Sequence, residues 1–255
     1  MNSIFVIAIN TFREIIRDRI LYGLIVFAIL LIGLSLILGE LSYVEQARIS
    51  ADFGFVAINI SAIIVAVFIG STLVSRELEQ RTIYTLLARP VTRVQFLLGK
   101  FLGLFLVNVL VAASLSVLMS IVFYYLKSPW NLACTLTVYG IMLESMIVLS
   151  MTVLFGTITR PMLVVSYSLG IFIIGRSMAS LNFFAEKSED PGFRFFNEIL
   201  QRIFPNLTKF SWSNYVVVKD QIPYPMILWS TLYAFSWVAI CVFISALIFR
   251  KKDFV

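Results

Sequence analysis

The sequence predicts an all-α membrane protein with six transmembrane helices and with both termini in the cytoplasm. Hydrophobic residues make up 60% of the 255-residue chain and charged residues only 13%, which is about half of their share in soluble domains. The mean hydropathy is +0.96. Apolar stretches of about 20 residues, the length that crosses the hydrocarbon core, recur along the chain. Lipid is therefore the main solvent, and we expect one membrane domain that covers residues 1–255.

The first predicted element is an amphipathic helix at 1–19. Phe5, Ile9, Phe12 and Ile16 recur at helical spacing and fall on one face. The opposite face carries four charged residues, which are Arg13, Glu14, Arg17 and Asp18. A helix with this pattern lies along a membrane surface, and we place it on the cytoplasmic side.

Six spans follow, and the basic residues orient them. The predicted spans are 20–38, 53–73, 96–126, 132–158, 162–181 and 226–249. Most of the 20 Lys and Arg residues fall on the side of the two termini, where they outnumber the acids. On the other side acidic and basic residues balance. The positive-inside rule therefore places the termini in the cytoplasm. The turns at 127–131 and 159–161 are short, so spans three to five should pack as antiparallel neighbours.

The cytoplasmic segment 75–92, between spans two and three, combines a charged helix with a corner. Glu77 and Arg81 are four residues apart, in the favourable order for a helical ion pair. Pro90 disfavours helical geometry at the residue before it and ends this helix. Thr92 and Gln95 then form a capping-box pattern, so a new helix should begin at Arg93. Such an element can pass a push from a soluble partner to a spanning helix.

The long segment 182–225 between spans five and six is predicted to lie on the outer side. Within it six apolar residues recur at helical spacing: Phe196, Ile199, Leu200, Ile203, Phe204 and Leu207. Polar residues occupy the other side: Arg194, Glu198, Gln201 and Arg202. This pattern predicts a short amphipathic helix at the outer membrane surface.

The run from Glu77 through Leu87, Arg89 and Pro90 to Gly99 and Lys100 resembles the signature of ABC-2 type, or type V, ABC exporter permeases. The layout of the whole chain is similar to members grouped with copper-enzyme-maturation and gliding-motility permeases. The resemblance implies that 75–92 is the coupling helix that docks on an ATPase, with 1–19 as a connecting helix and the outer helices capping an export path. Arg81 departs from the glycine that many members carry.

The coupling role then falls on a defined set of residues. It comprises Arg76, Glu77, Glu79, Arg81, Thr82, Leu86, Leu87, Arg89, Pro90 and Arg93, and the connecting helix contributes Arg13, Glu14, Arg17 and Asp18.

The resemblance also implies partners. Gly99 and Lys100 are followed by Phe101 and belong to no phosphate-binding loop, so we expect no ATP hydrolysis by this chain alone. Two separate ABC ATPase subunits would hold ATP and Mg²⁺. The other expected partners are a second permease copy in a homodimer or related heterodimer, lipids and periplasmic accessory proteins, with no nucleic acid. The expected location is the bacterial inner membrane.

Polar residues inside the predicted spans are few. Glu144 is the one carboxylate within a predicted span, which makes it a candidate for the translocation path or a dimer contact. Its alternative is a group protonated or paired within the bundle. For Asn108 an interhelical hydrogen bond is favoured over ligand recognition, and for Arg176 snorkelling to the interface. The chain has no His and two Cys, and we expect no metal site.

Four functional readings are open from the sequence. The first is an ATP-driven export permease. A variant of it transmits mechanical work to periplasmic partners. A secondary transporter or channel without an ATPase would need an intramembrane relay, for which the sequence offers mainly Glu144. An intramembrane enzyme ranks last, since the spans carry no paired acid and base and no nucleophile motif.

Overall fold

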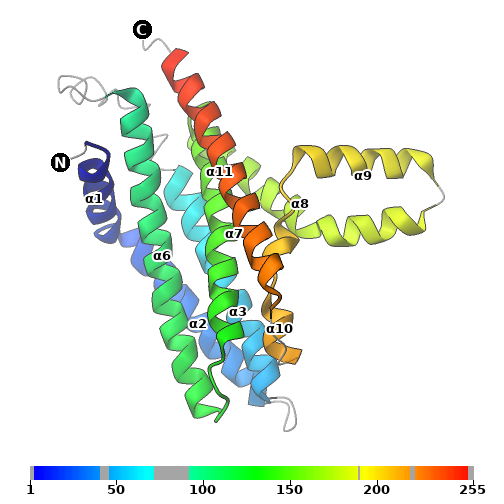
Figure 1. Cartoon of the computed structure of the whole chain (residues 1–255). Helices are drawn as coiled ribbons and strands as arrows, with labels where there is room; N and C mark the ends of the chain where they lie inside the picture. The colour runs from blue at the N-terminus through cyan, green and yellow to red at the C-terminus, as the bar shows by residue number, and fades with distance from the viewer. Residues whose placement is uncertain (1–2, 41–45, 72–91, 189, 219–221, 252–255) are drawn as a thin grey trace.

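The computed structural model describes residues 3–40, 46–71, 92–188, 190–218 and 222–251, and within these ranges it contains helices and turns but no strand. Six helices are long and apolar enough to cross a membrane. They are Leu21–Glu40, Gln46–Ile69, Val94–Tyr125, Leu132–Gly156, Pro161–Lys187 and Tyr224–Phe249. The all-α class with six spans is therefore confirmed. Helix α1 and the C-terminal end of α11 lie toward the same end of the bundle (Figure 1).

The helices occur in the following order along the chain. They are α1 (Ser3–Ile16), α2 (Arg19–Glu40), α3 (Gln46–Ile64) with the π-helix η1 (Val65–Ile69), α6 (Arg93–Tyr125), α7 (Leu132–Gly156), α8 (Pro161–Lys187), α9 (Pro191–Ile203), the 3₁₀-helix η2 (Leu207–Phe210), α10 (Ser213–Val218) and α11 (Tyr224–Lys251).

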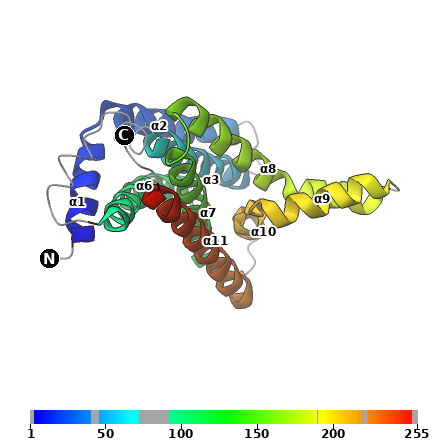
Figure 2. The same cartoon turned by 90° about the horizontal axis from the view of Figure 1, so that it is seen from above.

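Helix α7 forms the centre of the bundle. In its most apolar stretch 78% of the residues are buried, against 22% in that of α2. Helices α3, α6, α8 and α11 pack against it, as Figures 1 and 2 show. Ile147 and Leu149 of α7 are fully buried in the core. The outer helices expose large apolar side chains such as Leu30 and Phe243, as expected where lipid is the solvent.

The predicted start of the second span, at residue 53, is wrong. Helix α3 already begins at Gln46. Asp52 therefore lies inside the second candidate span, as Glu144 lies inside the fourth. The hydroxyl of Ser50 donates a hydrogen bond to the carbonyl of Ser35 in α2, at 3.2 Å. Hydropathy falls at the charged residues of 45–52, but the packing of α3 on α2 continues the helix through them.

The fifth span also differs from its prediction at 162–181. Helix α8 continues to Lys187, and its outer part pairs with α9 in a hairpin that projects sideways from the bundle (Figures 1 and 2). The side-chain oxygen of Asn182 accepts hydrogen bonds from the amides of Asn197, at 2.8 Å, and Gln201. These bonds join the two helices of the hairpin.

The start of α6 has the capping box that the sequence predicts. The hydroxyl of Thr92 accepts a hydrogen bond from the Gln95 backbone N–H at 3.3 Å, and the Gln95 side chain accepts one from the Thr92 N–H at 3.1 Å. Helix α6 therefore begins at a fixed residue directly after the predicted coupling segment.

Replacing Thr92 by alanine should fray this end of α6. Removal of a helix N-cap costs about 1 kcal/mol, so amide hydrogen exchange in the first turn of α6 should accelerate by roughly fivefold. Thr92→Ser keeps the hydroxyl and should exchange like the parent. Equal exchange in the alanine and serine variants would show that the cap does not hold this turn.

Candidate functional site

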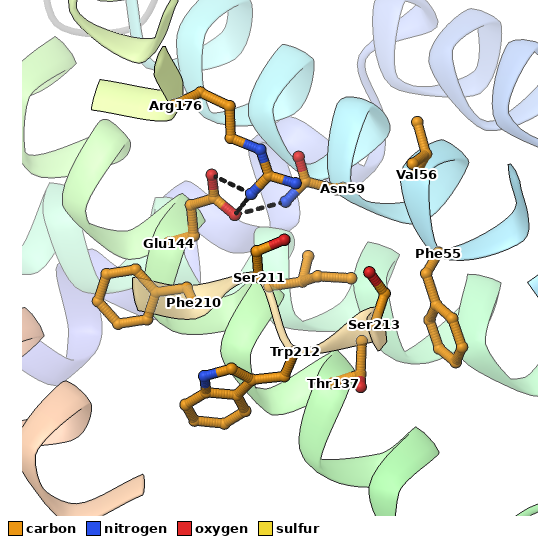
Figure 3. Close-up of a pocket in the computed structure, with 11 residues that line it drawn as sticks. Phe55, Val56, Asn59, Thr137, Glu144, Arg176, Phe210, Ser211, Trp212 and Ser213 are labelled. Atoms are coloured by element: carbon orange, nitrogen blue, oxygen red, sulfur yellow. Dashed lines mark hydrogen bonds and ion pairs between the residues drawn. The ribbon is translucent and has the colours of Figure 1, made fainter. Parts of the chain in front are cut away.

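A buried polar cluster joins three spanning helices in the middle of the bundle. Glu144 of α7 accepts a hydrogen bond from the Asn59 amide of α3, at 2.7 Å. Nη1 of Arg176, on α8, lies 3.1 Å from both carboxylate oxygens of Glu144. Figure 3 shows the guanidinium and the amide converging on this one carboxylate. One acid thus holds partners from the second and fifth spans.

The two charges of the cluster differ in their access to the surroundings. The side chain of Glu144 is completely buried, whereas that of Arg176 is 35% exposed. A cavity of about 20 Å³, measured for the centre of a water molecule, adjoins the pair, and this volume holds about one water. The hydroxyl-bearing residues Thr137, Ser211 and Ser213 line it (Figure 3). The site in this conformation is closed around the carboxylate and open on the side of the guanidinium.

The loop after η2 forms one wall of this cavity. Trp212 is fully buried, and its indole N–H donates to the Lys209 carbonyl at 2.7 Å. The loop can reach α7 because Gly140 has no side chain: a Cβ at this position would lie 2.8 Å from the Phe210 carbonyl oxygen. Gly140 is one turn before Glu144, so this close approach places the loop beside the carboxylate.

The cluster supports a structural role rather than catalysis. It contains one acid, one permanently charged guanidinium and one amide, so it offers no proton donor paired with a base. Separating α8 from α7 would leave a buried carboxylate without its countercharge, which is costly. The pair therefore resists independent movement of α3, α7 and α8.

The structure decides between the sequence-based readings of these polar residues. For Glu144, the paired alternative describes the observed state. The prediction that Arg176 snorkels to the interface is wrong, because its guanidinium turns inward to Glu144. Asn108 of α6 makes an interhelical hydrogen bond, as predicted, donating to the Ala62 carbonyl of α3 at 3.1 Å. Sequence reasoning does not identify Asn59 as part of the cluster. The signal in the sequence that points to the cluster is the pair of opposite charges, Glu144 and Arg176, in neighbouring spans.

A second feature is the contact of α1 with the first turns of α6. A Cβ at Gly99 would lie 2.7 Å from the Ile7 side chain, and one at Gly103 would lie 2.7 Å from the Ala8 carbonyl oxygen. The two glycines, four residues apart, let the helices approach at backbone distance. Lys100 also lies 3.5 Å from Glu14. Gly99 and Lys100 of the sequence signature thus attach the N-terminal helix to α6.

The remaining predicted residues are distributed as follows. Arg13 and Arg17 are exposed beside this junction. Asp18 is half-buried just after α1. Arg93 is the first residue of α6. The other coupling residues, which are Arg76, Glu77, Glu79, Arg81, Thr82, Leu86, Leu87, Arg89 and Pro90, lie outside the described residues.

A family model described as ABC-2 family transporter protein matches residues 5–254. No curated protein matches the chain.

Proposed function

Since this chain belongs to the ABC-2 family of transporter proteins, we propose that it is the permease subunit of an ATP-driven exporter, working as a dimer with two separate ATPase subunits. Proteins of this family are membrane components of transporters and not the catalytic subunits. The observation that carries the proposal is the family match, which runs through α1, all six spans and the α8–α9 hairpin. The ATPase subunits would hold ATP and Mg²⁺ on the cytoplasmic side of the bacterial inner membrane.

The geometry at the start of α6 supports a coupling role for the segment 75–92. This segment leads directly into the capped helix α6, whose 33 residues run to Tyr125 at the other end of the bundle. A movement at Thr92 is transmitted along α6 because a continuous helix is stiff along its axis. Helix α1 is attached to the same turns through Gly99, Lys100 and Gly103. A push on 75–92 would move α1 and α6 as one unit.

The buried cluster supplies the element that such a push would act against. Helix α6 is linked to α3 through Asn108, and α3 is linked to α7 and α8 through Asn59, Glu144 and Arg176. Rigid-body shifts of packed helices are a common form of switching in membrane and soluble proteins. We propose that nucleotide binding moves α1 and α6 relative to α3, α7 and α8, with the Asn108 contact as the joint between the two groups, and thereby opens the export path.

The test is charge reversal in the coupling segment of the full-length chain, co-expressed with an ABC ATPase that co-purifies with the parent chain. Glu77→Arg, Glu79→Arg, Arg81→Glu and Arg89→Glu are combined, and the yield of co-purified ATPase and its stimulation by the permease are measured. We expect both to fall by roughly tenfold or more, as for truncated charge pairs at interfaces. Lys127→Glu, on the exposed turn at the other end of α6, is the matched control and should leave both unchanged. Full co-purification and stimulation in the combined variant would reject 75–92 as the docking site.

A further inference from the structure

The α8–α9 hairpin, formed by residues 178–187 of α8 together with α9 (Pro191–Ile203), extends away from the rest of the bundle. Figures 1 and 2, which view the molecule from perpendicular directions, both show α9 beside α8 and apart from the other helices. Its exposed surface is therefore available to something outside this chain.

The depth of the hairpin follows from where its base is attached. Glu144 is the central residue of the 25-residue helix α7, about 18 Å from either end at 1.5 Å per residue. Arg176 binds Glu144, and the preceding residue, Gly175, packs against the chain just after α9: a Cβ there would lie 2.6 Å from the Pro205 carbonyl oxygen. The base of the hairpin thus lies beside the middle of a spanning helix. The C-terminal end of α9 is therefore attached level with the middle of α7.

The surface of α9 has two exposed faces of opposite character. Phe195 is 66% exposed, and Phe196, Ile199 and Ile203 on the same face are also exposed. The adjoining face carries Arg194, Glu198 and Arg202, all exposed. Within the described part of the chain, none of these three charges is in an ion pair.

Lipid does not suit this surface at this depth. A charged side chain near the bilayer centre is costly, and snorkelling relieves the cost only near the ends of a span. Non-helical backbone, such as that which joins the two helices of a hairpin, is tolerated at membrane depth only where protein or a water-filled cavity covers it. The occupant of the polar face must therefore offer countercharges, and that of the apolar face must offer apolar surface.

We propose that the α8–α9 hairpin docks on a second copy of this chain, with α9 packed antiparallel to the α9 of the partner copy. The row Arg194, Glu198, Arg202 alternates in sign at four-residue spacing. Consider an antiparallel pair whose twofold axis lies half a helical turn from Glu198. In this pair Glu198 of each copy faces an arginine of the other copy. The adjoining apolar row, Phe195 to Ile203, then meets its own copy. This inference rests on the dimer in the proposed function and assigns its contact surface.

The test is intermolecular disulfide formation in native membranes. The full-length chain carries Cys134→Ala and Cys241→Ala, which remove both native cysteines, and a single cysteine in place of Phe196, Ile199 or Ile203. Oxidation should give covalent dimers for at least one of these α9 positions. Leu30→Cys, on the exposed face of α2, reports the background of random collisions. Yields at all three α9 positions no higher than this background would overturn the proposal.

Charge exchange tests the pairing itself. Glu198→Arg places three positive charges in the row, and the disulfide yield at the best α9 position should fall roughly tenfold. Adding Arg194→Glu and Arg202→Glu reverses the whole row, restores alternation and should restore the yield. Lipid or an unrelated partner protein would not respond to this reversal, so a triple variant that stays low would contradict the self-complementary contact.

The outcomes separate this inference from the proposed function. If two differently tagged copies co-purify with a coupled ATPase but α9 gives no disulfide, the dimer exists and its contact lies elsewhere. If α9 gives disulfides but no ATPase binds, the contact stands and the exporter assignment fails.

Discussion

Replacing Glu144 by alanine should strongly lower the stability of the protein. The substitution removes the acceptor of the Asn59 amide and the countercharge of Arg176. Breaking a buried ion pair costs about 3–5 kcal/mol, and because Arg176 is 35% exposed we expect the lower end of this range. The thermal unfolding midpoint in detergent should then fall by roughly 6–12 °C, at 2–4 °C per kcal/mol for a chain of this size.

A double variant separates the pair from its parts. Glu144→Gln with Arg176→Met keeps an acceptor for Asn59 and removes both charges. Removing both partners of a buried pair is often close to neutral, so this variant should melt near the parent and well above Glu144→Ala. A double-mutant cycle built from the single changes gives the coupling energy of the pair. A Glu144→Ala protein that melts with the parent would show that the cluster does not stabilise the packing of α3, α7 and α8.

Leucine at Gly103 should separate α1 from α6. Its Cβ would lie 2.6 Å from Thr11 Cβ and 2.7 Å from the Ala8 carbonyl oxygen, and a backbone oxygen cannot rotate away. Overpacking costs about 1–3 kcal/mol, and each 1.4 kcal/mol changes an equilibrium about tenfold. Tryptic cleavage after the exposed Arg13 and Arg17 should therefore accelerate by roughly tenfold or more, and stimulation of the ATPase should fall with it.

Gly33→Leu is the matched control for this change. Gly33 is also a glycine in a spanning helix, but a Cβ there meets nothing within 4 Å. It should leave both cleavage and ATPase stimulation unchanged. Equal cleavage in the Gly103 and Gly33 variants would mean that α1 is not held to α6 by the two glycines.

The sequence predicts local features well when they depend only on residues that are close together in the chain. The capping box at Thr92 and Gln95 needs only the right side chains three residues apart, and the structure has it. The amphipathic pattern at 194–207 follows from periodicity, and α9 (Pro191–Ile203) covers most of it, but this helix ends before Phe204 and Leu207. By contrast, the predicted start of the second span at residue 53 followed hydropathy, which registers the charges of Arg48 and Asp52 but not the packing of α3 on α2 that keeps them helical.

The buried cluster lies beyond such local reasoning. Asn59 and Glu144 are 85 residues apart in the chain, and Arg176 is 32 residues beyond Glu144. Hydropathy reports that a segment enters the membrane but not which of its faces points to a neighbour. For that reason the sequence predicts Arg176 at the interface, although its countercharge Glu144 lies in the preceding span.

By itself the sequence determined six spanning helices, because the thickness and the polarity of the bilayer set the length and the composition of a span. It also determined the resemblance to a transporter family. Only the tertiary structure decided which polar groups meet, where α1 attaches and how deep the α8–α9 hairpin begins. Glycines at 99, 103, 140 and 175 set those contacts through the close approach of backbones, and such an approach depends on how whole helices pack together.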